Sequence, residues 1–306
     1  MSTFITPEIR KTSELPYHSD LAPGRRYVFL EQRMFPLSQF YIIGRYTESV
    51  PTNQPQYVDD HRHNCNSFYV FAGNASELSG LRAEVSIEGV LHNVASPCAA
   101  MVPAGALHHY RLTGGAGWFF HINLCPSYAD SLCAPETSVK PPAIRSLENM
   151  CSQALLITDV VRPGERPLQA LTTCIANPER WIFVSPSQFT APGVYVAMHR
   201  VLPGLPYQYR MNLHCHETDE VYVLVGQRGE ELEIEISGLD SPRTVISPGT
   251  VYHLPGTPHR YAHYRGSGLI LIVLREARPG TGYGFRSGQF QRTNSRVGRS
   301  ARRPAQ

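Results

Sequence analysis

The sequence predicts an all-β fold made of two similar barrels in tandem, joined by a partly helical connector. Short runs rich in β-branched and aromatic residues recur along the chain, and several alternate apolar with polar residues. Glycine (24) and proline (25) are frequent and separate these runs, as expected for strands joined by tight turns. The runs also occur in two matching series, which predicts two units of the same fold.

The two series align over five segments each. The first unit contains residues 40–49, 61–73, 81–89, 99–112 and 117–124, and the second contains residues 194–203, 214–226, 231–238, 248–264 and 268–274. Two matched histidines lie 47 residues apart in the first unit (His61 and His108) and 45 apart in the second (His214 and His259). Similar spacing across several strands indicates an internal duplication. Short strands at this pitch favour a closed or double-sheet barrel.

The chain divides into five predicted segments: an N-terminal arm that packs on a barrel (1–39), the first barrel (40–125), the connector (126–190), the second barrel (191–280) and a basic, disordered tail (281–306). In the connector we expect a helix over residues 147–156, with Ser146 as its N-cap. Residues 181–184 are expected to form an added strand.

The net charge of +3 is unevenly distributed, because residues 281–306 hold six arginines and no acidic residue. The remainder of the chain is therefore mildly acidic. No aromatic or motif signature accompanies the arginines, so nucleic acid is not an expected partner.

The sequence also bears on location in the cell. The N-terminal residues do not resemble a signal peptide, and no run of about 18 apolar residues predicts a membrane span. The seven cysteines are scattered without a C-x-x-C pair, which favours free thiols and a cytoplasmic protein.

The second unit carries a cluster of residue types that bind metals. His214 and His216 are two residues apart, so on a strand both imidazoles face the same side. Glu220 follows four residues later, and a strand–turn–strand stretch can return His259 to the same place. Three neutral nitrogens and one carboxylate leave open positions on a six-coordinate ion, which suits Fe, Mn, Ni or Cu and, less exclusively, Zn. We therefore expect one divalent transition metal here, with Fe(II) favoured.

This pattern continues with Gly226, P-G-T at 248–250 and G-x-x-H at 256–259, and as a whole it resembles the cupin superfamily. The first unit resembles a diverged copy of the same motifs, so the chain is similar to a bicupin over roughly 190 residues. The resemblance implies double-stranded β-helix (jelly-roll) barrels with the metal inside, held by the three histidines and Glu220. It does not fix the reaction, because cupins include dioxygenases, isomerases, decarboxylases, lyases, hydrolases and binding proteins.

The first unit keeps His61, His63 and His108 but has Ser67 where the second unit has Glu220. Two interpretations stay open. A three-histidine site can still hold a second metal ion, such as Fe(II), Cu or Zn. Alternatively, the first barrel has lost its metal and serves as a scaffold or a dimer surface.

Three functional hypotheses follow. The favoured one is an Fe(II)-dependent oxygenase in which a small organic substrate and O₂ bind at the open positions in the second barrel. The alternatives are a non-redox isomerase, lyase, decarboxylase or hydrolase with the ion as Lewis acid, and a binding protein without turnover. Candidate catalytic residues are Glu220, Tyr222 and Arg260.

The expected partner is a small-molecule substrate. No P-loop, GxGxxG, GxSxG or HExxH pattern occurs, which argues against a nucleotide-cofactor enzyme and a serine hydrolase. Cupin-like barrels often pair through sheet edges or arms, and residues 1–40 are the candidate segment for such a homodimer contact.

Overall fold

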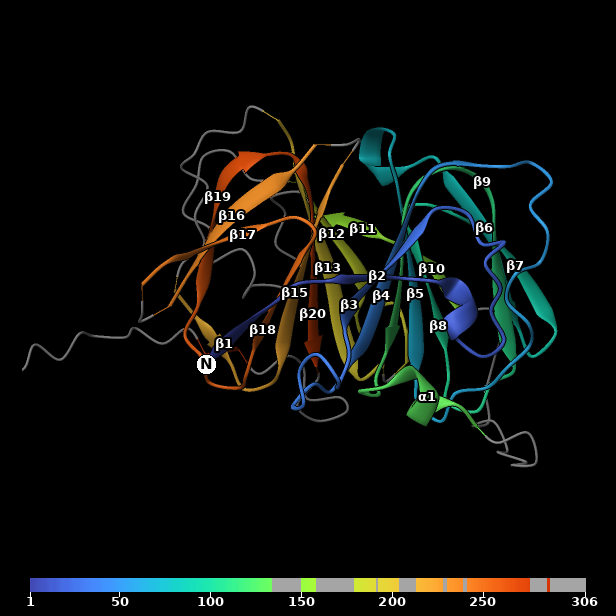
Figure 1. Ribbon diagram of the computed structural model, residues 1–306, viewed down its shortest axis with the longest axis horizontal. Coiled ribbons are helices and arrows are strands. Elements are labelled where there is room, and N and C mark those ends of the chain that lie inside the picture. The colour runs from blue at the N-terminus through green and yellow to red at the C-terminus, as the bar shows by residue number, and fades with distance from the viewer. Residues whose placement is uncertain are drawn as a thin grey trace, which may run out of the picture.

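The computed structural model describes residues 1–133, 150–157, 179–190, 192–203, 213–227, 230–238, 241–275 and 285–286. Within these residues the chain is almost entirely antiparallel β-structure, which confirms the predicted fold class. The two barrels lie side by side, with the N-terminal barrel on the right of Figure 1 and the C-terminal barrel on the left. The described helical segments are short: η1 (Thr12–Glu14), η2 (Ser76–Leu78) and α1 (Tyr128–Ser131).

The first barrel is built on one large sheet. Its strands, in spatial order, are β10 (Cys151–Gln153), β8 (Cys98–Val102), β5 (Ser67–Gly73), β9 (His108–Asn123), β4 (Tyr41–Val50), β3 (Arg25–Leu30) and β2 (Glu8–Arg10). The hairpin β6 (Leu81–Ile87) and β7 (Val90–Ala95) pairs with the first half of β9 and forms the opposite wall.

The second barrel repeats this arrangement. The strands of its large sheet, in spatial order, are β1 (Ser2–Ile5), β18 (Gly249–His253), β15 (Glu220–Gly226), β20 (Gly268–Arg275), β13 (Val194–Val201), β12 (Glu179–Val184) and β11 (Leu155–Ile157). A smaller sheet of β17 (Arg243–Ile246), β16 (Leu232–Ser237) and β19 (Arg260–Gly266) forms the opposite wall. The short strands β14 (Cys215–His216) and β21 (Phe285–Arg286) pair separately.

The two large sheets have the same strand order, which agrees with the predicted duplication. Their outer strands, however, come from unexpected parts of the chain. β1 pairs with β18 of the second barrel, whereas β2 and β3 join the sheet of the first barrel. In Figure 1 the dark blue N-terminal strand runs from β2 across to β18. Residues 1–39 therefore supply strands to both sheets, and the predicted segment boundaries themselves stay a prediction.

The central strands of the large sheets are buried on both faces. On β5, Tyr69 and Phe71 point into the first barrel, whereas Phe68, Val70 and Ala72 point into a second core between the barrels. On β15, Val221, Val223 and Val225 reach the same core from the other side. Two-sided burial explains why these strands are nearly continuous apolar runs rather than alternating ones. The core between the barrels fixes one sheet against the other.

One expectation was wrong where the structure describes the residues concerned, and the tail prediction is not tested beyond two residues. The helix predicted over residues 147–156 is replaced by β10 and β11, because each strand completes an open sheet edge by pairing with β8 or β12. Such tertiary pairing overrides local helix propensity. Residues 146–149 lie outside the described residues. In the predicted disordered tail, Phe285–Arg286 pairs as β21 with β14. The strand expected at 181–184 is present within β12.

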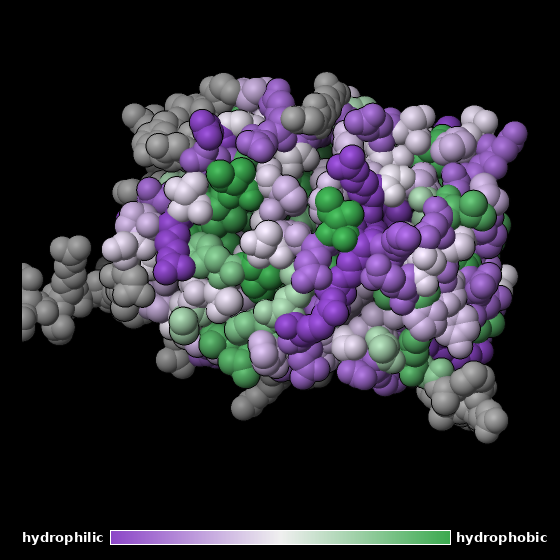
Figure 2. Space-filling view, in the orientation of Figure 1, coloured by the Kyte–Doolittle hydropathy of each residue, from purple (hydrophilic) through white to green (hydrophobic). Residues whose placement is uncertain are grey.

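The surface in Figure 2 is mixed in character. Hydrophilic side chains form a band across the middle of this face, in the region of β2, and apolar side chains gather beside it over the second barrel. Arg10 of β2 pairs with Glu8 and, at 2.7 Å, with Glu31. No helix among the described residues is long and apolar enough to cross a membrane. Six of the seven cysteines are described, and all six are free thiols.

The core between the barrels leads to a stability prediction. Phe68 is fully buried there, with its ring centroid 6.4 Å from that of Phe189. We expect Phe68→Ala to lower the free energy of unfolding by about 3–5 kcal/mol, because it leaves a cavity between the two sheets. The matched control is Leu91→Ala on β7, since Leu91 is 53% exposed. Chemical denaturation should show a single transition, and two separate transitions would argue against a shared core.

Candidate metal centres

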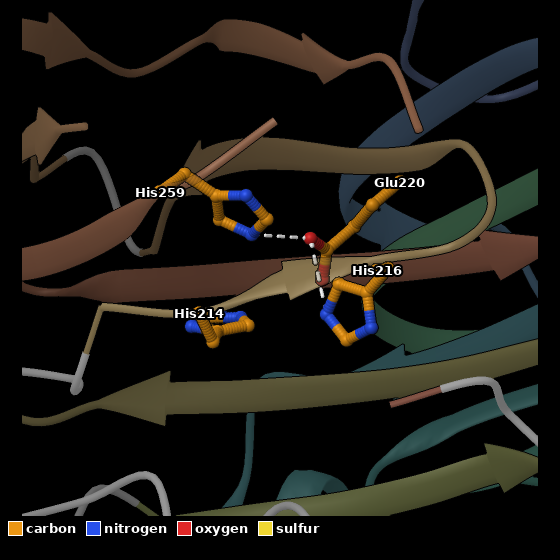
Figure 3. Close-up of side chains that lie close together, drawn as sticks. All are labelled: His214, His216, Glu220 and His259. Carbon is orange, nitrogen blue, oxygen red and sulfur yellow. Dashed lines mark ion pairs between the residues drawn. The ribbon is translucent and has the colours of Figure 1, made fainter. Parts of the chain in front are cut away.

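The structure brings together the four predicted residues of the second barrel. We call His214, His216, Glu220 and His259 the second cluster, and their ligand atoms all lie within 4.8 Å of one another. The backbones of His214 and His259 form an antiparallel bridge, in which the N–H of each residue donates to the carbonyl of the other. Glu220 is the first residue of β15. Figure 3 shows the imidazoles and the carboxylate converging on one point. All four side chains are buried.

Hydrogen bonds orient the imidazole of His259 for metal binding. His259 Nδ1 lies 2.8 Å from the carbonyl oxygen of Thr257, and because a carbonyl only accepts, Nδ1 must carry the proton. His259 Nε2 then presents a lone pair toward Glu220 Oε2, only 2.5 Å away. Burial lowers the pKa of His259 to about 4, so this imidazole is neutral near pH 7. Two facing lone pairs repel each other, so the site fits a bound cation.

The first barrel holds a second set of converging histidines. We call His61, His63 and His108 the first cluster, and their ligand atoms also lie within 4.8 Å of one another. His61 Nδ1 lies 2.8 Å from the Asp59 carbonyl, and His108 Nδ1 lies 2.9 Å from the Ala106 carbonyl. Both rings therefore direct an unprotonated Nε2 into the cluster. Burial is the main cause that lowers the pKa of all three histidines, which keeps them neutral as metal binding requires.

The one-turn helix α1 completes the surroundings of the first cluster. Ser131 Oγ donates to the Tyr128 carbonyl at 2.6 Å, so its hydroxyl proton is occupied. His63 Nδ1, 2.8 Å from Ser131 Oγ, must therefore be the donor, and its Nε2 is again a lone pair. Tyr128 Oη lies 3.2 Å from His61 Nε2. Within the described part of the chain, the Nε2 atoms of His63 and His108 are buried without a hydrogen-bond partner, a cost of roughly 1–3 kcal/mol each that a metal ion would remove.

The first cluster lacks a carboxylate because Ser67 takes the place of Glu220. Ser67 begins β5 as Glu220 begins β15, so the two residues hold the same register position in the two barrels. Ser67 is fully buried, and its Oγ has no hydrogen-bond partner among the described residues. Both clusters thus fit a metal ion, but only the second provides a negative charge from the aligned position.

The two other candidate catalytic residues lie in different surroundings. The Tyr222 ring is fully buried inside the second barrel, 5.7 Å from the His259 ring. Arg260 lies on the opposite face of β19 from the buried Tyr261, because neighbouring residues of a strand face opposite sides. Its Nε donates to Ser237 Oγ at 2.9 Å. A catalytic role for either residue stays a prediction, and the geometry favours Tyr222.

Sequence reasoning missed a further buried histidine near each cluster. His121 of β9 lies in the first barrel, with its ring centroid 5.8 Å from that of His63. His253 of β18 stacks on His259 at 3.9 Å, and its Nδ1 lies 2.8 Å from Ser2 Oγ of β1. Neither belongs to the H-x-H or G-x-x-H motif, so motif spacing gave no signal. The available clue was that both histidines fall at positions of β9 and β18 whose side chains face the barrel interior.

The comparisons with known proteins rest on structure. No protein-family model and no curated protein matches the sequence. AerE from Microcystis aeruginosa superposes with a TM-score of 0.52 at 13% sequence identity, over 89% of this chain and 99% of that chain. Oxalate decarboxylase from Bacillus subtilis at pH 4.6 gives 0.53 at 14% identity, over 90% of this chain and 76% of that chain. Another structure of this enzyme, from a study of its Mn(II) centres, gives 0.52 at 14% identity, over 91% and 78%.

The chain has the bicupin fold. This agrees with the resemblance of its motifs to those of cupins. At 13–14% identity the similarity establishes the fold of the chain and leaves its reaction open. Within this fold, the second cluster keeps the full ligand set of the motif, and the first cluster keeps its three histidines.

The lowered pKa values of the buried histidines predict that the stability of the metal-free protein depends on pH. Burial lowers the pKa of both His216 and His259 to about 4 from the ordinary 6.5. The unfolded chain therefore takes up these protons at higher pH than the folded chain. We expect the free energy of unfolding to be greatest above about pH 6.5 and to fall as the pH drops toward about 4.

Urea denaturation of chelator-treated protein at several pH values measures this effect. His259→Gln should flatten the dependence over this range. His109→Gln is the control, because His109 is partly exposed on the opposite barrel and pairs with Asp60. Equal unfolding free energies across the range would contradict the prediction.

Proposed function

We propose that this bicupin is a metal-dependent enzyme whose divalent ion is held by His214, His216, Glu220 and His259. The convergence of three imidazoles and one carboxylate inside a barrel is the observation that supports it. Four protein ligands leave open positions on a six-coordinate ion for a small organic substrate. An ion bound there would supply Lewis acidity or, if it is iron, redox chemistry.

The protein side of the reaction follows from the second barrel's interior. The carbonyl of Thr257 holds His259 in the tautomer that can bind metal, and Glu220 would offset one of the two positive charges of a divalent ion. The Tyr222 hydroxyl is the nearest predicted candidate for hydrogen bonding to a substrate, since its ring lies against His253 and His259. Apolar side chains such as Leu224, Ile270 and Ile272 line the same interior and exclude water.

The favoured reaction class is an Fe(II)-dependent oxygenase acting on a small metabolite. Three histidines and one carboxylate suit Fe(II), and the open positions allow substrate and O₂ to bind together. A non-redox lyase or decarboxylase is the second candidate. It is favoured by the similarity in fold to oxalate decarboxylase, a protein studied for its Mn(II) centres. We further propose that the enzyme works in the cytoplasm, where its free cysteines remain reduced.

The ligand role of Glu220 is tested by Glu220→Ala. Removing the single carboxylate should weaken metal binding in the second barrel by more than the 10- to 100-fold that loss of an outer-shell partner typically costs. The measurement is a metal titration with elemental analysis of the purified protein. Glu233→Gln is the matched control, because Glu233 is also a buried strand carboxylate but pairs with Arg265. An unchanged metal affinity in Glu220→Ala would remove Glu220 from the ligand set.

The reaction class is tested by loading the protein with Fe(II) without oxygen and then measuring O₂ uptake. The screen covers small aromatic acids, amino acids and dicarboxylates, with oxalate included. Substrate-dependent O₂ consumption that disappears in Glu220→Ala supports the oxygenase. Bound Mn or Zn, with CO₂ release or isomerisation and no net O₂ consumption, supports the non-redox class instead. Turnover of no compound with any of these metals would favour a binding protein.

A further inference from the structure

The first barrel contains a buried tyrosine hydroxyl at its cluster. Tyr128 lies on α1, directly after the N-cap residue Ser127, and only 3% of it is exposed. Its Oη lies 3.2 Å from His61 Nε2 and 3.3 Å from His18 Nδ1. His18 Nδ1 also lies 2.8 Å from the Pro16 carbonyl, so this nitrogen is a donor toward both oxygens. The phenol oxygen is therefore held at the cluster by one contact with His61 and one with His18.

The spacing of these atoms is that of two ligands on one ion. Metal–ligand bonds of about 2.0–2.1 Å at tetrahedral angles place neighbouring donor atoms roughly 3.3 Å apart. Tyr128 Oη and His61 Nε2 are 3.2 Å apart. The Tyr128 ring also lies edge-on to the His63 ring, with centroids 5.0 Å apart. A metal ion on the three Nε2 atoms would therefore have the phenol oxygen within reach.

The charge of the first cluster points to the same residue. Three neutral histidines leave a divalent ion without a negative ligand, and Ser67 cannot replace Glu220 in this respect. Burying an uncompensated dication is costly. Asp60, the nearest acidic side chain in the motif, is 55% exposed and bonds His109 at 2.7 Å instead. Among the described residues, Tyr128 is the buried phenol with a hydrogen-bond contact to a nitrogen of the cluster, and a phenol can bind a metal as an anion.

We propose that Tyr128 is the fourth protein ligand of a metal ion in the first barrel and takes the role that Glu220 has in the second. When the ion binds, the phenol proton passes to water and the oxygen joins the three Nε2 atoms. The first centre is then a three-histidine, one-tyrosine site, chemically different from the three-histidine, one-glutamate site of the second barrel. This inference concerns a different barrel and does not depend on the proposed reaction.

The test uses Cu(II), because a phenolate bound to Cu(II) gives a charge-transfer band in visible light that imidazole or carboxylate ligands do not. The full-length protein carries His216→Ala, which weakens the second cluster, so that Cu(II) is directed to the first. We expect the visible band, and we expect resonance Raman spectra excited in it to show tyrosine ring modes. Deuterated tyrosine should shift those modes without any substitution at Tyr128.

The variants assign the band to one residue. Tyr128→Phe should remove the band and raise the Kd for Cu(II) by more than the 10- to 100-fold that loss of an outer-shell partner typically costs, while leaving three-nitrogen copper coordination visible by electron paramagnetic resonance. Tyr69→Phe is the matched control, because Tyr69 is a fully buried tyrosine whose ring lies 6.1 Å from the ring of His108. It should keep the band. His108→Ala should abolish copper binding in the first barrel.

Three outcomes would overturn the proposal. The first is Cu(II) bound through the first cluster without a charge-transfer band. The second is a band that survives Tyr128→Phe or is lost equally in Tyr69→Phe. The third is copper binding that His108→Ala leaves unchanged, since the first cluster would then hold no ion. If Tyr128→Phe fails to fold, the Raman spectrum of labelled protein without that change still decides whether a tyrosine is bound.

Discussion

Burial of both faces of the two large sheets is the constraint on which the rest of this structure depends. Side chains of β5 and β15 alternate between a barrel interior and the core that the barrels share. The shared core needs apolar residues throughout, so the polar residues of these two strands face the barrel interiors. Glu220 and Ser67 occupy the first position of each strand. The packing that holds the two barrels together thus also fixes where along each barrel the cluster lies.

Backbone carbonyls then decide what each cluster can bind. A histidine whose Nδ1 donates to a carbonyl has no choice of tautomer, and its Nε2 must face inward as a lone pair. The carbonyls of Asp59, Ala106 and Thr257 act in this way, each two residues before the histidine it orients. The repetition of this contact in both barrels shows that the geometry belongs to the duplicated unit. The same orientation of the histidines is therefore found in the first barrel, which lacks the aligned carboxylate.

The two barrels have diverged in what surrounds their histidines. In the second barrel, the surroundings come from β15, from β18 and from β1, the N-terminal strand that pairs with β18. Ser2 of β1 contacts His253. In the first, they come from α1 and from the N-terminal segment, where the Tyr17 ring stacks on His61 at 5.6 Å. Segments outside the repeated unit therefore complete both sites. A duplicated barrel can change its chemistry by changing these additions while its own strands stay constant.

The sequence by itself determined the β-class, the duplication and both sets of histidines, because these depend on local alternation and on spacing between matched strands. It also located the difference between Ser67 and Glu220, since the aligned motifs differ at that one ligand position. The tertiary structure decided the features that depend on contacts between distant segments of the chain. Residues 151–157 became two strands because open sheet edges were available to pair with them. Tyr128, Ser131 and His253 reached the clusters through contacts between segments distant in sequence, which leave no periodic signal in the chain.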